Sequence, residues 1–276
     1  MAASLLTPGQ RLARALVRVA AGLGFVFLLA PILIIIPISF SSGSFLNYPL
    51  PGLSLQWYEV ALRPFPWLQS FRNSLIIAAF TTVLATALGT LAAVGLANLQ
   101  WRWKPLLTAL LISPMVVPLV ITALALYFAF ARVGFLGTFT GMVLAHTVLA
   151  APFVVVTVTA TLQGYDRTLT RAAGSLGAGP FTAFRTVTLP MIMPGVASGA
   201  IFAFVTSFDE IVVALFIASP AQFTLPRQLF AGLRDQLDPS IVAVAVMLIV
   251  LSALLLTVME LLRWRSERLT RAARPD

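Results

Sequence analysis

The most informative part of the chain reads Arg171-Ala172-Ala173-Gly174-Ser175-Leu176-Gly177, then Pro180-Phe181, and then Val187-Thr188-Leu189-Pro190. It belongs to the longest interruption of an otherwise apolar sequence, with apolar runs on both sides. Asp166 is expected to cap a first helix over 167–176, because a carboxylate accepts from the free N–H groups of a first helical turn. Gly177 and Gly179 permit a sharp turn, and Pro180 suits the start of a second helix, expected to end near Val187 and before Pro190.

The composition is that of a membrane protein. Of the 276 residues, 59% are hydrophobic and 10% are charged, whereas a soluble domain carries about 25% charged residues. The net charge of +9 does not indicate nucleic acid, because the basic residues lie in short segments between apolar runs. The chain has no cysteine and a single histidine, His146, which excludes a disulfide framework, a thiolate metal site and a multi-histidine site.

Six apolar segments are each long enough to cross a hydrocarbon core of roughly 30 Å as a helix. They lie near 19–40, 73–98, 106–131, 139–162, 191–218 and 241–262. The sequence therefore predicts an all-α integral membrane protein with six transmembrane helices, built as a single transmembrane domain over 1–276. Pro114 and Pro118 lie in the third segment, and a bend is expected there because proline removes a backbone hydrogen bond.

The basic residues predict an orientation, since cytoplasmic loops of membrane proteins are enriched in Lys and Arg. Of the 18 such residues, 13 lie on the side that carries both termini and the loop 163–190. The other side carries five, namely Arg63, Arg72, Arg132, Arg227 and Arg234. We therefore expect both termini and the loop 163–190 to be cytoplasmic.

Small residues recur at every fourth position of the second segment, at Thr81, Ala85, Gly89, Ala93 and Ala97. On a helix they form one smooth stripe, which lets a neighbouring backbone come close in lipid. The neighbour is either another helix of the same chain, which is the preferred interpretation, or a partner subunit.

The loop 163–190 resembles the cytoplasmic coupling loop of permease subunits from bacterial ABC importers. The resemblance is carried by Ala172-Ala173, Leu176-Gly177-Ala178, Phe181 and Leu189-Pro190. The family pattern begins with Glu-Ala-Ala, whereas Arg171, of opposite charge, stands at the first position here. The resemblance implies that this loop contacts an ATPase subunit through Arg171, Ala172, Ala173, Gly177, Phe181, Leu189 and Pro190.

Other motifs resemble the spermidine/putrescine branch of that family. They are Asn73-Ser74-Leu75, Pro152-Phe153-Val154-Val155, Ser207-Phe208-Asp209-Glu210, Thr224-Leu225-Pro226 and Asp238-Pro239-Ser240. The resemblance implies a permease that moves a small amine, preferably a polyamine, across the bacterial inner membrane. The branch is also similar to permeases for aminobutyrate-type acids, opines and phosphonates, so these cargoes stay open.

Asp209 and Glu210 lie inside the fifth apolar segment, where an ionised group costs several kcal/mol unless it is paired or hydrated. On one helix they would point about 100° apart, so both cannot face a narrow lumen equally. Asp209 is favoured for the substrate path, since the polyamine branch also carries an aspartate there, and Glu210 is expected to meet a sister subunit. The predicted path comprises Phe208, Asp209, Glu210 and His146. The alternatives are a structural acidic pair and, as the preferred interpretation of His146, a satisfied core histidine.

The chain contains no Gly-rich phosphate loop of the Walker type, so ATP hydrolysis is expected on another chain. The resemblance implies two ATPase subunits that bind ATP and Mg, a homologous sister permease and a periplasmic substrate-binding protein, assembled in the lipid bilayer. No catalytic residue, resident cofactor or metal is predicted for this chain. Two rival classes remain, a secondary transporter and an integral-membrane enzyme that uses Asp209, Glu210 and His146 for acid–base chemistry.

Overall fold

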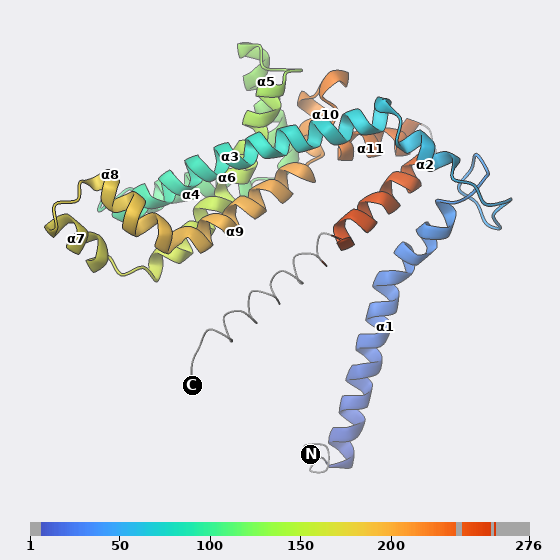
Figure 1. Cartoon of the computed structure of the whole chain (residues 1–276), viewed down its shortest axis with the longest axis horizontal. Helices are drawn as coiled ribbons and strands as arrows, with labels where there is room; N and C mark the ends of the chain where they lie inside the picture. The colour runs from blue at the N-terminus through green and yellow to red at the C-terminus, as the bar shows by residue number, and fades with distance from the viewer. Residues whose placement is uncertain (1–6, 236–238, 255–256, 258–276) are drawn as a thin grey trace. The chain divides into compact units, whose positions relative to one another are not determined.

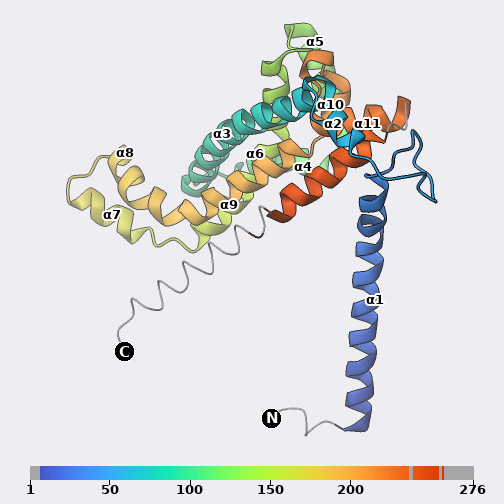
Figure 2. The same ribbon diagram turned by 45° about the vertical axis from the view of Figure 1, so that its right-hand side comes forward.

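A computed structural model describes residues 7–235, 239–254 and 257. Within these residues every regular element is a helix, and the sole β-type contact is an isolated bridge between Ser41 and Leu53. The chain divides into two compact units, Met1–Arg63 with Gly232–Asp276, and Pro64–Ala231. Figures 1 and 2 show the helices from two sides. The predicted helical class is confirmed for the described residues.

The first unit contains α1 (Pro8–Ile38), α2 (Gln56–Ala61) and an apolar helix over Ser240–Leu254. α1 begins at a reciprocal cap, in which the Thr7 hydroxyl accepts from the Gln10 N–H and the Gln10 side chain accepts from the Thr7 N–H. The most apolar window of α1 has a mean hydropathy of 2.8, and none of its residues is buried. A long apolar helix that the described residues leave uncovered needs lipid around it.

The second unit is built around three long helices that lie side by side, α3 (Gln69–Asn98), α6 (Phe139–Gln163) and α9 (Leu189–Phe208) (Figure 1). Their buried apolar side chains form its core. The shorter elements between 64 and 235 are a kinked turn at Pro64–Leu68, α4 (Lys104–Val116), α5 (Leu119–Val133), α7 (Thr168–Ser175), α8 (Pro180–Ala183), a π-helical turn at Phe184–Thr188, α10 (Val212–Ile217), a 3-10 turn at Pro220–Gln222 and α11 (Leu225–Asp235).

The small-residue stripe of α3 packs against α6 of the same chain. The stripe residues Thr81, Ala85, Gly89 and Ala93 are all buried. A Cβ placed on Gly89 would lie 2.6 Å from the Cβ of Val154 in α6, and one placed on Gly199 of α9 would lie 3.0 Å from the Cα of Val154. Val154 therefore fits between two glycines, and the preferred interpretation of the stripe is confirmed.

Four helices of the described chain are long and apolar enough to cross a membrane, Leu12–Ile38, Pro64–Asn98, Phe139–Gln163 and Pro180–Phe208. α4 and α5 add a fifth crossing if the bent pair is counted as one span. The predicted span 241–262 is described only to residue 254 and at residue 257, where its described part is the shorter helix noted above. Several apolar crossings are thus present, and the count of six stays a prediction.

The third and fifth predicted spans are both broken. α4 and α5 meet at 104°, and between them Val117 (φ −68°, ψ 133°) and Pro118 (φ −52°, ψ 129°) are extended. Proline pushes the residue before it out of the helical region and removes a backbone donor, which accounts for this break. The fifth span stops at Phe208 and resumes at Val212. The bend expected in 106–131 is thus a full break, and the expectation of an unbroken helix over 191–218 is wrong.

Gly89→Ala tests the packing of α3 on α6. The added methyl group would meet the Val154 side chain at 2.6 Å and the Ala151 carbonyl oxygen at 3.0 Å, so the two helices must move apart. We expect the stability to fall by about 1–3 kcal/mol, measured as a lower unfolding temperature of the purified protein in detergent micelles. The control is Gly95→Ala on the same helix, where nothing lies within 4 Å of the added Cβ. Equal stability of the two variants would contradict the role of Gly89.

Candidate functional site

The two helix breaks border one cavity of about 610 Å³. Residues 114–119 line it from the break between α4 and α5, and 209–211 line it from the break between α9 and α10; Leu149 and Phe153 of α6 and Val205 and Thr206 of α9 complete the lining. Non-helical backbone at membrane depth is tolerated only where protein buries it or where it lines a water-filled cavity. Since broken helices form binding sites in membrane transporters, this cavity is the candidate functional site.

Asp209 borders the cavity as an exposed residue. Its backbone N–H still donates to the Val205 carbonyl oxygen at 3.0 Å, while its φ of −92° and ψ of 0° turn the chain out of α9. In the described parts of the chain no hydrogen bond or ion pair occupies its carboxylate. This carboxylate is therefore available to a ligand in the cavity.

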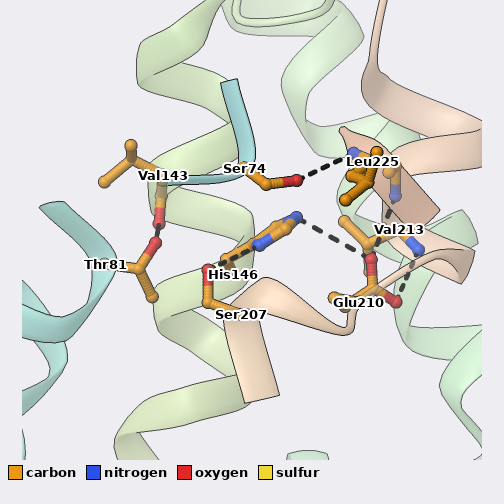
Figure 3. Close-up of polar contacts among 9 residues, drawn as sticks. Ser74, Thr81, Val143, His146, Ser207, Glu210, Val213 and Leu225 are labelled. Atoms are coloured by element: carbon orange, nitrogen blue, oxygen red, sulfur yellow. Dashed lines mark hydrogen bonds and ion pairs between the residues drawn. The ribbon is translucent and has the colours of Figure 1, made fainter. Parts of the chain in front are cut away.

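Glu210 borders the same cavity, but its carboxylate is bonded inside the protein (Figure 3). Oε1 accepts from the Val213 N–H at 2.9 Å and Oε2 accepts from the Ala214 N–H at 3.1 Å. These bonds satisfy two of the free donors at the start of α10, and Glu210 is only 6% exposed. Its own chain therefore binds the Glu210 carboxylate, and the expectation that Glu210 meets a sister subunit stays a prediction. The helical angle assumed between Asp209 and Glu210 is wrong, because both lie at the break.

His146 of α6 lies against this break with its ring fully buried. Its Nδ1 is 2.9 Å from the Ser207 hydroxyl oxygen, and its Nε2 is 3.7 Å from Oε2 of Glu210 (Figure 3). His146 is not among the residues that line the cavity. The geometry is that of a histidine whose polar atoms face partners inside the protein.

Phe208 also lies outside the lining of the cavity. Its ring packs edge-on against Phe71 of α3, with 6.4 Å between centroids, and stacks on Phe204 of α9 at 5.8 Å. Of the four residues predicted for the substrate path, the structure brings Asp209 and Glu210 to the cavity and places His146 and Phe208 in the surrounding packing.

Sequence reasoning did not identify Phe153 and Val205 as cavity residues. Both follow the four-residue spacing of a helical face, since Phe153 lies one turn after Leu149 and Val205 lies one turn before Asp209. Counting back one turn from Asp209 would therefore have found Val205. No comparable signal links α6 to this site, because the contact depends on how the helices pack.

Two motifs from distant parts of the sequence meet near the start of α3. The Asn73 side-chain amide donates to the carbonyl oxygens of Ala221 and Phe223, both at 3.0 Å. The Ser74 hydroxyl oxygen accepts from the Leu225 N–H at 2.8 Å. Asn73 and Ser74 are buried, so these bonds supply partners to backbone groups that have little access to water. The bonds also attach the segment 221–225 to α3.

The loop 163–190 begins as predicted. The Asp166 carboxylate accepts from the Thr168 backbone N–H at 2.9 Å and from the Thr168 hydroxyl at 2.7 Å, at the start of α7. These two bonds hold the pKa of Asp166 below its ordinary value, because they favour the ionised form. Gly177 makes the turn toward α8 with φ of +86°, a left-handed conformation that glycine adopts without strain.

The second helix of the loop does not end before Pro190. α8 continues through the π-helical turn Phe184–Thr188 into α9, and Pro180–Phe208 is one helix of 29 residues. The π-helical turn directly before α9 changes the hydrogen-bond register at the point where Pro190 lacks a donor. The predicted stop is therefore wrong, and Leu189 and Pro190 join the loop to the membrane helix.

The predicted coupling residues are spread along this hairpin: Arg171, Ala172 and Ala173 in α7, Gly177 in the turn, Phe181 in α8, and Leu189 and Pro190 at the start of α9. Leu176 and Phe181 are 90% and 73% exposed, so the described chain leaves two large apolar groups uncovered. Arg167 fixes the hairpin to α3 by donating to the Ala97 carbonyl oxygen at 2.6 Å. A second attachment is a hydroxyl cluster that links α7 to the turn before α9, made by Tyr165, Thr170 and Thr188.

Comparison with known proteins gives consistent matches. Residues 85–268 match the family described as the binding-protein-dependent transport system inner membrane component. The chain is 34% identical over 239 residues to the spermidine/putrescine transport system permease protein PotC of Escherichia coli (strain K12), covering 86% of this chain and 90% of PotC. It is 36% identical over 234 residues to the putrescine transport system permease protein PotI of the same strain, covering 82% of this chain and 83% of PotI.

A solved structure shares the fold. It is a crystal structure of a bacterial ABC transporter involved in the import of the acidic polysaccharide alginate, and the TM-score is 0.77 with 15% identity. The match covers 93% of this chain and 98% of that chain. At this identity the likeness concerns the fold alone.

Glu210→Gln tests the cap on α10. The amide has one acceptor oxygen and adds a donor, so the N–H of either Val213 or Ala214 loses its partner inside the protein. We expect the stability to fall by about 1–2 kcal/mol, measured as a lower unfolding temperature in detergent micelles. Asp209→Asn is the control and should leave that temperature unchanged, since the Asp209 side chain is exposed. An unfolding temperature for Glu210→Gln equal to that of the unmodified protein would rule out the cap as a stabilising contact.

Proposed function

The chain belongs to the family of binding-protein-dependent transport system inner membrane components, and we propose that it is the permease subunit of an ATP-driven importer for a polyamine such as spermidine or putrescine. Family membership makes it a multi-pass membrane component of a transport system and separates it from enzymes. The observation in the structure that most directly supports a cationic cargo is the open carboxylate of Asp209 at the cavity formed by two helix breaks.

The chemistry of the cavity suits an ammonium group. A carboxylate and an ammonium 4 Å apart attract each other by about 1 kcal/mol in bulk water and by about 4 kcal/mol at an effective dielectric constant near 20. The lining described above is mainly apolar around Asp209, which lowers the local dielectric constant. The Phe153 ring also borders the cavity, and it stacks on Phe202 of α9 with 6.2 Å between the ring centroids.

The same lining disfavours an anionic cargo. Among the described residues that border the cavity none is Lys or Arg, so a phosphonate or carboxylate would meet Asp209 without a compensating cation. The relatives named for spermidine and putrescine transport point in the same direction. We therefore favour a polyamine over the aminobutyrate-type acids, opines and phosphonates that the sequence resemblance leaves open.

The partner subunits of the transporter are proposed from family membership. The chain would pair with a homologous sister permease, receive cargo from a periplasmic substrate-binding protein, and be driven by two ATPase subunits that hold ATP and Mg. This chain needs no cofactor of its own in that scheme. With both termini and the loop 163–190 on the cytoplasmic side, the exposed Leu176 and Phe181 would be available to the ATPase.

Transport in this proposal requires no covalent chemistry from the chain. Closure of the ATPase dimer would push the loop 163–190 and switch the pore from inward-facing to outward-facing. The binding protein would then release the polyamine to the carboxylate of Asp209, and ATP hydrolysis would restore the inward-facing state. The permease contributes a shaped path and a fixed negative charge.

Asp209→Asn tests the cargo. The substitution keeps the shape of the side chain and removes its charge, so we expect the maximal rate of putrescine uptake in vesicles containing the complete transporter to fall roughly tenfold or more. Asp209→Glu restores the charge and should recover part of the rate. Glu59→Gln is the control, because Glu59 is an exposed carboxylate in α2 that does not border the cavity.

Two results would remove the polyamine assignment. One is an unchanged uptake rate for Asp209→Asn when the variant still co-purifies with the ATPase. The other is transport of a zwitterionic or anionic amine by the unmodified complex with no polyamine uptake. Either result leaves the family membership intact.

Gly177→Val tests the coupling role of the loop. A β-branched residue forced to φ of +86° costs about 1–3 kcal/mol in local strain, which should distort the turn between α7 and α8. We expect ATP hydrolysis to continue while cargo uptake per ATP falls severalfold in reconstituted vesicles. Gly174→Val is the control, since its added Cβ, like that of Gly177, would meet nothing within 4 Å and its φ is not positive. Full coupling in Gly177→Val would exclude this turn from the coupling contact.

A further inference from the structure

We propose that His146 positions Asp209 by holding together the two sides of the break between α9 and α10. Ser207 lies in the last turn of α9, Glu210 caps α10, and His146 of the neighbouring helix α6 lies close to both (Figure 3). The proposal rests on the function proposed for Asp209, although the contacts themselves do not depend on the cargo.

The burial of His146 calls for such a role. Its side chain is fully buried and does not line the cavity, so it does not touch a cargo bound there. Burying a polar ring costs about 1–3 kcal/mol when it lacks partners. Ser207, 61 positions further along the chain, offsets part of this cost through its hydrogen bond with Nδ1. Glu210, 64 positions further along, is an electrostatic neighbour of Nε2 at 3.7 Å and not a hydrogen-bond partner. These two contacts lie on opposite sides of one break. Because the His146 ring contacts both sides, it limits how far the two sides of the break can move relative to each other.

The hydrogen-bonding groups are complementary in one arrangement of the ring. A neutral imidazole has one N–H donor and one acceptor nitrogen. Both oxygens of Glu210 already accept from backbone N–H groups, so the arrangement that suits them has its N–H at Nε2, which faces Oε2 at 3.7 Å as an electrostatic contact longer than a hydrogen bond. The acceptor Nδ1 then receives the Ser207 hydroxyl at 2.9 Å. Each side of the break is thus attached to a different nitrogen of one ring.

Asp209 lies between these two attachments. Ser207 and Glu210 are 2% and 6% exposed, whereas Asp209 is exposed at the cavity. The backbone of Asp209 has left the helix and has no helical restraint after it until Val212. Without the ring, Ser207 and Glu210 lose their common neighbour, and rotation about the backbone at 209–211 moves the Asp209 carboxylate away from the cavity. His146 is therefore a positioning residue that acts through Asp209.

Substitutions of His146 separate the two attachments. Alanine removes both, asparagine places an amide near the Nδ1 position and keeps a partner for Ser207, and glutamine places an amide near the Nε2 position and keeps a partner for Glu210. In vesicles containing the complete transporter, we expect His146→Ala to lower the maximal rate of putrescine uptake by roughly tenfold, equivalent to about 1.4 kcal/mol. His146→Asn or His146→Gln should recover part of the rate. Thr81→Val is the control, since Thr81 is a fully buried polar residue that does not contact the break.

A double variant distinguishes positioning from general damage. If His146 acts through Asp209, adding His146→Ala to Asp209→Asn should slow uptake no further than Asp209→Asn alone, because the charge to be positioned is already absent. Losses that multiply in the double variant would overturn the proposal.

Thiol labelling tests the positioning without any cargo. The chain contains no cysteine, so Asp209→Cys introduces a single reactive site into this subunit. We expect a cationic thiol reagent to modify it at a rate that His146→Ala changes severalfold, that His146→Asn or His146→Gln changes less, and that Thr81→Val leaves unaltered. The proposal would be overturned if the His146 variants were labelled at the same rate as Asp209→Cys alone. If alanine prevents assembly, the asparagine and glutamine variants still allow this comparison. Normal uptake by Asp209→Asn would instead overturn the proposed function, and the labelling rates would still decide the role of His146.

Discussion

Hydrogen bonding of the backbone within the membrane is the constraint on which the rest of this structure depends. A helix that stops inside lipid leaves N–H and C=O groups without water to serve them. The two breaks meet this constraint differently. At the break between α4 and α5, Pro118 has no N–H to satisfy. At the break between α9 and α10, Glu210 supplies two acceptor oxygens to the free N–H groups of Val213 and Ala214. Adjacent carboxylates thereby take different tasks, one structural and one open to a ligand.

The close packing of α6 and α9 brings these groups into register. A Cβ on Gly195 or Gly199 would fall 2.1 Å or 2.7 Å from the hydroxyl oxygens of Thr161 and Thr157, so only glycine fits at these positions of α9. The two threonines satisfy their hydroxyl groups on carbonyl oxygens of α6 itself, which lets them face a neighbouring backbone without leaving a polar atom unpaired. Because α6 and α9 pack closely here, His146, which lies nearer the start of α6, reaches Ser207 near the end of α9.

The sequence predicts this molecule where the signal is local and fails where a distant contact decides. Composition identifies the membrane class, the small-residue stripe predicts close helix packing, and Gly177 marks a turn that the structure confirms. No proline lies at Asp209 to predict the break there. Hydropathy also does not predict that the Glu210 carboxylate accepts from the N–H groups at the start of α10. The stop expected before Pro190 fails because a π-helical turn accommodates the missing donor. The contact of His146 with this break depends on how α6 and α9 pack, so it could not be predicted from the spacing of residues along the chain.

The helix Pro180–Phe208 has a mechanical consequence. Figures 1 and 2 show it bent where α8 passes into α9, so its longest part is α9, whose 20 residues at about 1.5 Å each span about 30 Å from Leu189 to Phe208, directly before Asp209. If α9 pivots by about 8° at its start, its other end moves by about 4 Å, which exceeds the reach of a hydrogen bond. A small rotation imposed at the loop is therefore enough to make or break a contact at the Asp209 carboxylate. The same leverage works in reverse, so a cargo that fixes the position of Asp209 also restricts the angles at which the loop can present Phe181 to its surroundings.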